Sequence, residues 1–254
     1  MHFTPHSARY SDDLDFFHDS EARVAAAFAA DRAHLETAGY VVRVELSQPG
    51  FIRAVVGRDG DATRVDWAHD SAWRFLPLVP DPLGGWLLHP IDLALNKLLA
   101  LAGRDEPRDF VDILYAHRTI LPLGGLVWAA AGKDPGLSPR SLLELLRRRR
   151  PGRPEEYRRL QLAAPFDVEA AHAVWRRALD EAEQFVRSRP ATELGCLYFA
   201  VRRGDFTLPA PDATLEAQGL VVHYGAPGGV LPKLTEAALA TEDVDGSADD
   251  PLPR

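Results

Sequence analysis

Hydrophobic residues follow two different patterns along the chain, and the change between them falls near residues 80–90. Before this point, apolar residues occur in short strand-like runs that turn residues separate. After it, they recur every three or four positions, which is typical of helices that bury one face. The pattern predicts a sheet-bearing first half followed by a helical half, without an internal repeat.

The first half is expected to hold one helix and several strands. A strand is predicted over residues 12–17, and an amphipathic helix is predicted over residues 20–38, where Gly39 ends it. Three further strands are predicted over residues 40–46, 51–58 and 63–68, and the segments between them are rich in turn residues. A helix followed by a strand meander indicates an α+β (α/β-like) fold with a small mixed sheet.

The second half is expected to be mostly helical. Pro90 and Asp92 are typical of a helix start, and leucines at helical spacing continue to Gly103. Pro107 opens the next helix, and further helices are predicted over residues 122–131, 138–149 and 167–188. Near the end, the pattern predicts a hairpin around Arg203-Gly204 and another strand over residues 220–224.

These patterns divide the chain into three parts. A sheet core is expected over residues 1–85, and a mostly helical domain with the small C-terminal hairpin is expected over residues 86–239. Residues 240–250 hold five acids and no base, so residues 240–254 are predicted to form a disordered acidic tail.

The composition limits the class of protein. The chain has 254 residues, of which 46% are hydrophobic, and this is enough for a sizeable core. Its single cysteine, Cys196, excludes an intramolecular disulfide and is expected to be buried. The first twenty residues are polar, and no apolar run approaches the roughly 20 residues that span a bilayer. We therefore expect a cytoplasmic protein without a membrane partner.

The first predicted strand carries two acids that alternate with apolar residues. Side chains of a strand alternate between its faces, so Asp13 and Asp15 are expected on one face and Leu14 and Phe16 in the core. The two Cα atoms would lie roughly 6.7 Å apart. Two carboxylates at this spacing can converge on Mg²⁺, a hard cation that takes oxygen ligands. Their mutual repulsion requires a cation or a base nearby.

Asp66 repeats this pattern in the third strand of the meander, where an acid is unusual because Asp is depleted in strands. A third carboxylate on a neighbouring strand would complete a site for two metal ions, which can activate a hydroxyl and stabilise a departing pyrophosphate. In the alternative interpretation, Asp13, Asp15 and Asp66 are ordinary exposed acids on one face of the sheet.

A lysine and a second acidic pair follow in the helical half. The chain has only three lysines, and Lys97 lies in the middle of an apolar helix. A lysine is a compact charge suited to a phosphate, although a surface lysine with a buried stem would fit the pattern as well. Asp109 and Asp112 are three residues apart and so share one helix face. Asp109 also stands in a first turn, where the helix dipole alone favours an acid.

Taken together, these residues resemble the AbiEii/AbiGii toxin nucleotidyltransferases of the polymerase-β-like superfamily. The segment Arg9–Phe17 is similar to the first acidic motif of that family, and Asp66 stands where a third carboxylate is expected. The segment Asp92–Leu101, followed by Arg104 and by Arg108–Asp112, is similar to the lysine and arginine-aspartate signature. The resemblance covers residues 9 to about 118.

The resemblance implies Mg²⁺-dependent transfer of a nucleotide from an NTP to an acceptor. Some members of the family modify tRNA ends, so tRNA or another RNA is an expected acceptor, and a cognate antitoxin is an expected partner. Asp13, Asp15 and Asp66 would hold the metal, with Asp66 as a ligand or base. The remaining expected site residues would bind the nucleotide or orient its ligands: Ser11, Lys97, Arg104, Asp109 and Asp112.

One departure from the family leaves two interpretations open. The family carries a Gly-Gly or Gly-Ser turn before its first acidic strand, where backbone amides cradle phosphates, whereas the first glycine of this chain is Gly39. Either the start has been placed too late, or the protein is a shortened form with weak or no catalysis. A catalytically silent binding protein of the same fold is therefore the alternative function. A hydrolase based on histidine is less favoured, because the histidines show no ligand spacing.

Overall fold

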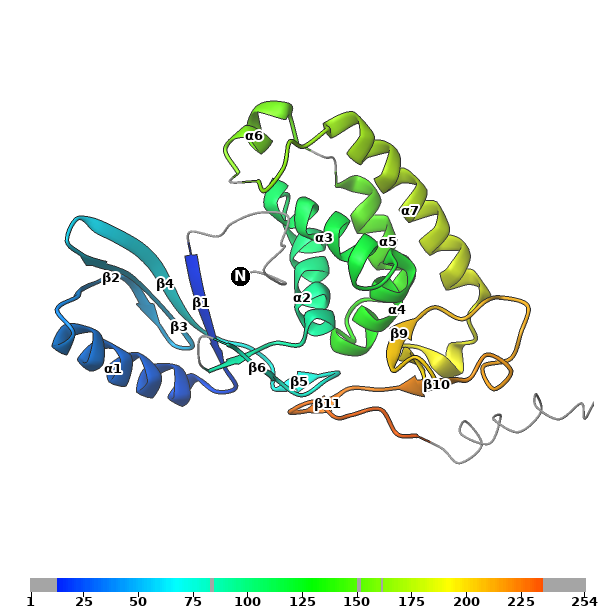
Figure 1. Cartoon of the computed structure of the whole chain (residues 1–254), viewed down its shortest axis with the longest axis horizontal. Helices are drawn as coiled ribbons and strands as arrows, with labels where there is room; N and C mark the ends of the chain where they lie inside the picture. The colour runs from blue at the N-terminus through cyan, green and yellow to red at the C-terminus, as the bar shows by residue number, and fades with distance from the viewer. Residues whose placement is uncertain (1–12, 83–84, 150–151, 161, 235–254) are drawn as a thin grey trace, which may run out of the picture.

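The computed structural model describes residues 13–82, 85–149, 152–160 and 162–234. Within them, a four-stranded sheet with one helix along it stands beside a bundle of helices, and a small second sheet packs against the far end of that bundle (Figure 1). The predicted α+β class with a small mixed sheet and a helical part is confirmed. Ser11 and the expected acidic tail lie outside the described residues.

The large sheet contains the predicted strands in the order β1-β4-β3-β2. Strand β1 is parallel to β4, and the other neighbours are antiparallel, so the sheet is mixed. Helix α1 begins after Ser20, whose side chain accepts a hydrogen bond from the backbone N–H of Arg23 at 3.3 Å. The elements of this part are β1 (Asp13–His18), α1 (Glu21–Thr37), β2 (Val41–Gln48), β3 (Phe51–Arg58) and β4 (Asp61–His69).

The helical part contains all the predicted helices and one that was not predicted, the short α6. Four of these helices (α2, α3, α5 and α6) begin with a proline at the first position, which needs no N–H partner there. The helices are α2 (Pro90–Gly103), α3 (Pro107–Thr119), α4 (Leu123–Lys133), α5 (Pro139–Arg148), α6 (Pro154–Arg158) and α7 (Val168–Ser188).

The remaining elements are short. The predicted C-terminal hairpin and strand form a three-stranded sheet in the order β10-β8-β9. Two-residue strands β5 and β11 pair with each other, as do β6 and β7, and none of these four was predicted. Their bounds are β5 (Trp73–Arg74), β6 (Val79–Pro80), β7 (Trp86–Leu87), η1 (Ala191–Glu193), β8 (Leu197–Ala200), β9 (Asp205–Thr207), β10 (Leu220–His223) and β11 (Ala226–Pro227).

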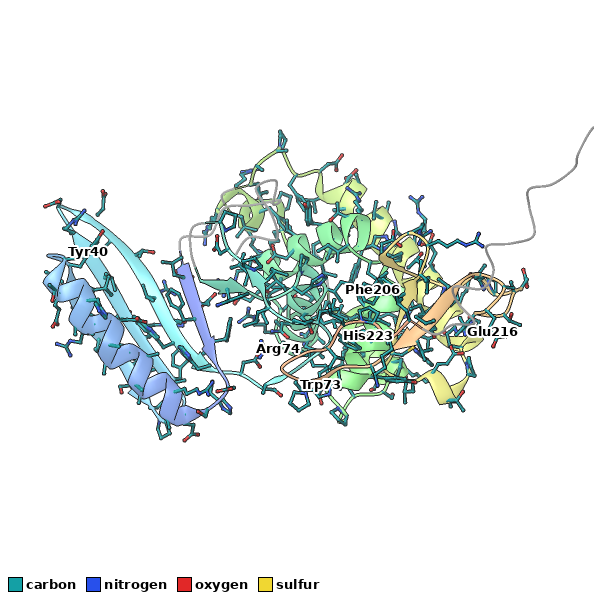
Figure 2. The ribbon with its side chains drawn as sticks, turned by 60° about the horizontal axis from the view of Figure 1, so that its bottom comes forward. Tyr40, Trp73, Arg74, Phe206, Glu216 and His223 are labelled. Carbon is teal, nitrogen blue, oxygen red and sulfur yellow. The ribbon has the colours of Figure 1, made fainter. Side chains whose placement is uncertain are left out.

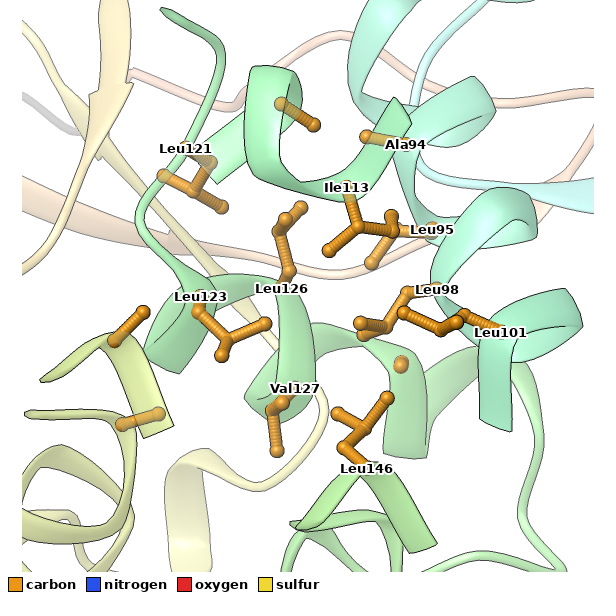
Figure 3. Packing of buried hydrophobic residues seen from close by; sticks show 14 of the residues in the cluster. Ala94, Leu95, Leu98, Leu101, Ile113, Leu121, Leu123, Leu126, Val127 and Leu146 are labelled. Atoms are coloured by element: carbon orange, nitrogen blue, oxygen red, sulfur yellow. The ribbon is translucent and has the colours of Figure 1, made fainter. Parts of the chain in front are cut away.

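Separate hydrophobic clusters lie under the sheet and inside the bundle. One face of the large sheet packs on α1 through a cluster that runs from Val24 to Trp67. The larger cluster starts at Phe75 and joins α2 to α5 and α7, and Figure 3 shows leucines of these helices meeting at its centre. The chain thus passes from the cluster under the sheet to the cluster of the bundle between Trp67 and Phe75. The domain limit near residue 85 stays a prediction. Cys196 is buried, as expected.

The expectation that Leu14 and Phe16 lie in the core is wrong. Both side chains are on the α1 face of the sheet, but 52% of Leu14 and 47% of Phe16 are exposed. The cause is the position of β1, which is an edge strand, whereas the strands at the centre of the sheet bury Ile52, Val65 and Trp67 beneath α1. Alternation predicted the face correctly, but burial depends on what covers the face.

The last described segment returns to the connection between the sheet and the bundle. Strand β11 pairs with β5, with Ala226 opposite Arg74, and the ring Nε2 of His223 lies 2.9 Å from the carbonyl oxygen of Phe75. Figure 2 places Trp73, Arg74 and His223 together near this junction. The connection after β4 is therefore held by residues from the far end of the described chain.

No single helix in the described part of the chain is long and apolar enough to cross a bilayer. Only a bent pair, Pro107–Thr119 with Leu123–Lys133, meets the criteria of length and composition, with 112° between its helices.

Candidate active site

The three candidate metal ligands lie on one face of two adjacent strands. In the parallel pair β1 and β4, Asp13 is opposite Arg64 and Asp15 is opposite Asp66. Asp13 and Asp15 share a face because they are two residues apart, and Asp66 shares that face as the register partner of Asp15. This face is opposite to the face that α1 covers, where Leu14 and Phe16 lie.

Asp66 is held by Arg53, an arginine that the sequence pattern did not indicate as a site residue. Arg53 of β3 donates from Nε to Oδ1 at 2.8 Å and from its terminal nitrogen to Oδ2 at 2.6 Å. Such a two-pronged pair fixes the plane of the carboxylate. Its hydrogen bond to Asp66 raises the pKa of Arg53 against the opposing effect of burial, and the charge of Asp13 adds to the rise.

The position of Arg53 follows from the hairpin that joins β3 to β4. Its two-residue turn, Asp59-Gly60, has positive φ at both residues (56° and 95°), the backbone that a tight type I′ turn requires. A two-residue turn pairs residues that are equally far from it, and Arg53 and Asp66 are each six residues away. The Asp-Gly dipeptide therefore was the signal that could have predicted the pair.

Asp13 connects the sheet to the helical part. One oxygen lies 3.8 Å from Nε of Arg64 on β4, and the other lies 3.8 Å from a terminal nitrogen of Arg108 on α3. The repulsion among the three carboxylates is therefore offset by Arg53, Arg64 and Arg108, which come from three different elements.

Lys97 pairs with both acids of α3. Its Nζ lies 3.1 Å from Asp112 and 3.6 Å from Asp109, and both acids are buried. Arg104, in the connection between α2 and α3, donates from Nε to the other oxygen of Asp109 at 2.7 Å. This hydrogen bond raises the pKa of Arg104, and the charge of Asp15 contributes to the same rise. The order α2–turn–α3 thus brings two cations onto one pair of acids.

The predicted site residues form two groups that face each other. The sheet contributes Asp13, Asp15 and Asp66, and the α2–α3 pair contributes Lys97, Asp109 and Asp112, with Arg104 and Arg108 between the groups. Lys97 is bound to its helical partners rather than to the acids of the sheet. Within the residues that the structure describes, no three His, Cys, Asp or Glu side chains are grouped so that they could hold a metal ion.

A cavity of about 240 Å³ opens beside Asp15. It continues along β1 past Phe17 and is bounded by the β6–β7 hairpin through Trp86 and by Arg74 of β5. A smaller cavity of about 30 Å³ shares Phe17 and Arg74 with it and reaches Lys133. The site therefore has Arg108 next to Asp13, and a partly aromatic cavity that also contains Arg74 next to Asp15.

Another buried acid, Asp92, has a structural role. Its carboxylate accepts hydrogen bonds from the backbone N–H groups of Phe75 (2.8 Å) and Leu76 (2.9 Å), and it is fully buried. Burial raises the pKa of Asp92 despite these two bonds. The first turn of α2, which the sequence predicted at Pro90, thus also holds the connection after β4 in place through Asp92.

A mixed sheet with paired acids on its open face, opposite helices that present cations, is the arrangement of a nucleotidyltransferase-like protein. A family model described as "Nucleotidyl transferase AbiEii toxin, Type IV TA system" matches residues 2–194. The chain belongs to this AbiEii family of nucleotidyl transferase toxins. No curated protein and no solved structure matches the chain.

Proposed function

We propose that this chain transfers a nucleotide from an NTP to an acceptor in a Mg²⁺-dependent reaction. The observation that carries the proposal is the meeting of two oppositely charged groups across the site. Asp13 and Asp15 come from the sheet, whereas Arg104 and Arg108 come from the helical part and lie close enough to influence them. A triphosphate and a hard cation together need this combination of carboxylates and cations.

The donor set suits Mg²⁺ in its chemistry. Asp13, Asp15 and Asp66 offer only carboxylate oxygens, from adjacent positions on one face, and Mg²⁺ prefers such ligands. When bound, Mg²⁺ would neutralise charge on the phosphates and on the leaving pyrophosphate. Asp13 and Asp15 would hold the ion. Both oxygens of Asp66 accept hydrogen bonds from Arg53, so Asp66 would become a ligand only when the cation replaces Arg53.

The helical residues are proposed to hold and orient the triphosphate. Lys97 is fixed between Asp109 and Asp112, so its ammonium group loses little freedom when it contacts a phosphate. Arg104 is fixed by Asp109 in the same way and keeps other N–H groups for the substrate. Asp109 and Asp112 therefore act as positioning residues for these cations.

Label transfer tests the proposal. The purified protein is incubated with α-labelled NTPs, Mg²⁺ and total RNA, and labelled RNA is expected. Asp13→Asn and Asp15→Asn should abolish the transfer, whereas Asp61→Asn, an exposed acid at the start of β4, should leave it unchanged. Absence of transfer by the wild type, or transfer that survives both substitutions in β1, would contradict the proposal.

A catalytically silent binding protein of the same fold is the second candidate. The observation that favours it is that arginines already pair with the acids of the sheet. Asp66 pairs with Arg53, and Asp13 pairs with Arg64 and Arg108. Carboxylates whose charge is offset by arginines need no metal ion for stability. Calorimetric titration with ATP separates the candidates. Binding that depends on Mg²⁺ supports the transferase, and NTP binding that is absent or indifferent to Mg²⁺ supports the silent protein.

The family description identifies its members as toxins of type IV toxin–antitoxin systems. For this chain we propose a cytoplasmic toxin that modifies tRNA or another RNA and has a cognate antitoxin, because NTPs and RNA acceptors are present in that compartment. Induced expression should arrest growth, and Asp15→Asn should relieve the arrest. Sequencing of the RNA ends from arrested cells would identify the acceptor, and unchanged RNA ends would contradict this assignment.

A further inference from the structure

We propose that the cavity beside Asp15 binds a nucleobase, which stacks on Trp86 and Phe17. The inference rests on the proposed function, since it assigns the place of one part of the substrate. It is carried by the position of the cavity, its size and the side chains that line it.

The position of the cavity suits the part of a nucleotide that extends away from its phosphates. Asp13 lies next to Arg108, whereas Asp15, whose charge also acts on Arg104, borders the cavity. Phosphates held near Arg104 and Arg108 would leave a sugar and base to extend past Asp15. The cavity begins at this point and follows β1 toward its C-terminal end.

The size of the cavity fits one ring system. Sites for complete drug-sized ligands measure about 300–1,000 Å³, and this cavity measures about 240 Å³. It therefore has room for a base but not for a base together with its sugar and phosphates.

The lining of the cavity suits a flat, polar-edged ring. Trp86 is 69% exposed, and Phe17 is exposed as well, so their ring faces are accessible. Within the described part of the chain, neither ring forms a stacked or edge-to-face pair with another aromatic ring. Arg74 supplies N–H donors at the wall of the cavity. Base stacking on aromatic residues, supported by arginine, is a common means of holding nucleotides without strong selection among bases.

Calorimetry on the full chain tests the inference without requiring turnover. ATP and inorganic tripolyphosphate are titrated, each with Mg²⁺, into the wild type and into Trp86→Ala. We expect ATP to bind more tightly than tripolyphosphate, and Trp86→Ala to weaken ATP binding about tenfold, an effect typical of one stacked base. Tripolyphosphate binding should not change, and Trp86→Phe should restore most of the affinity for ATP.

Val41→Ala is the matched control. Val41 is 71% exposed, about as much as Trp86, but it lies in β2, at the edge of the large sheet opposite to β1 and its cavity. Its substitution should change neither titration. An equal loss of affinity in Val41→Ala and Trp86→Ala would show a general effect on the fold and overturn the inference.

A second pair of titrations identifies the source of the base. Two short RNA oligonucleotides are compared, one intact and one with an abasic residue at its 3′ end. If the cavity holds the acceptor's base, Trp86→Ala weakens binding of the intact RNA to the level of the abasic RNA and leaves ATP unaffected. If it holds the base of the NTP, only ATP is affected. If neither ligand is affected, the inference is overturned.

These outcomes are distinguishable from failure of the proposed function. Binding that depends on Trp86, without any label transfer, would retain the base site and reject catalysis. Label transfer together with binding that is independent of Trp86 would reject the base site alone. A wild-type protein that binds neither ATP nor RNA would overturn both.

Discussion

Replacing Arg53 by methionine should destabilise the protein and at the same time increase its response to Mg²⁺. The substitution removes both hydrogen bonds to Asp66 but keeps a flexible apolar stem of similar length. Asp66 would remain on the sheet as a largely buried carboxylate, with 11% of its side chain exposed and without its arginine partner. An uncompensated carboxylate in this position favours any cation that can replace the arginine.

The size of the effect follows from the exposure of the two partners. Breaking a buried ion pair by removing one partner costs about 3–5 kcal/mol. Because 34% of the Arg53 side chain is exposed, solvent screens part of the interaction, and we expect a loss of about 2 kcal/mol. For a chain of this size, that loss corresponds to a decrease in Tm of about 4–8 °C.

Thermal unfolding with and without Mg²⁺ provides the measurement. Without Mg²⁺, Arg53→Met should melt below the wild type, and Arg53→Lys should melt between them because it retains the charge but not the two-pronged geometry. Mg²⁺ should raise the Tm of Arg53→Met more than that of the wild type, because a ligand stabilises the state that binds it more tightly. Arg43→Met, which removes an exposed arginine from β2 of the same sheet, is the control.

Two results would refute this reasoning. If Arg53→Met were as stable as Arg43→Met, the pair with Asp66 would contribute nothing to the fold. If Mg²⁺ stabilised Arg53→Met and the wild type equally, Arg53 would not compete with a cation for Asp66. In that case the three carboxylates would not act as one metal site.

Three further results are expected. Lys97→Met should lower the free energy of unfolding by about 3 kcal/mol, because it removes a shared cation from two buried acids and leaves Asp109 with Arg104, and Asp112→Asn in the same chain should recover part of the loss in urea titrations. Burial lowers the pKa of His223. As the pH falls below about 6.5, the unfolded chain therefore binds a proton at this residue before the folded chain does, which favours unfolding. The Tm should fall between pH 7 and pH 5.5, and it should fall less in His223→Gln. Gly132→Ala should destabilise the fold, because a Cβ there would overlap the facing backbone, whereas Gly103→Ala, where no atom lies within 4 Å, should be neutral or stabilising in the same melts.

Much of the fold could be predicted because local signals and tertiary packing agree. Helix α2 has the bounds that Pro90 and Gly103 indicated, and α3 begins at Pro107 as predicted. In both cases a proline defines the start and an apolar stripe defines the buried face. The five-residue α6 was not predicted, because an element this short does not show a helical period.

The predicted site residues had to be brought together by topology, which a sequence pattern does not contain. Alternation placed Asp13 and Asp15 on one face, but the parallel pairing of β1 with β4 places Asp15 beside Asp66. Arg53 was missed because only the register of the hairpin sets it opposite Asp66. The burial of Phe16 was predicted wrongly because periodicity does not show that β1 is at an edge.

The pairing of β5 with β11 has a consequence for the order of folding. Arg74 and Ala226 are opposite each other although 152 residues separate them in the chain. Closing so large a loop costs more entropy than forming a local contact, so contacts of this kind form after local helices and hairpins. During synthesis, the sheet and the helical bundle can each fold while the connection between them is still unsupported. The two halves of the site should thus acquire their fixed spacing only when β11 has left the ribosome.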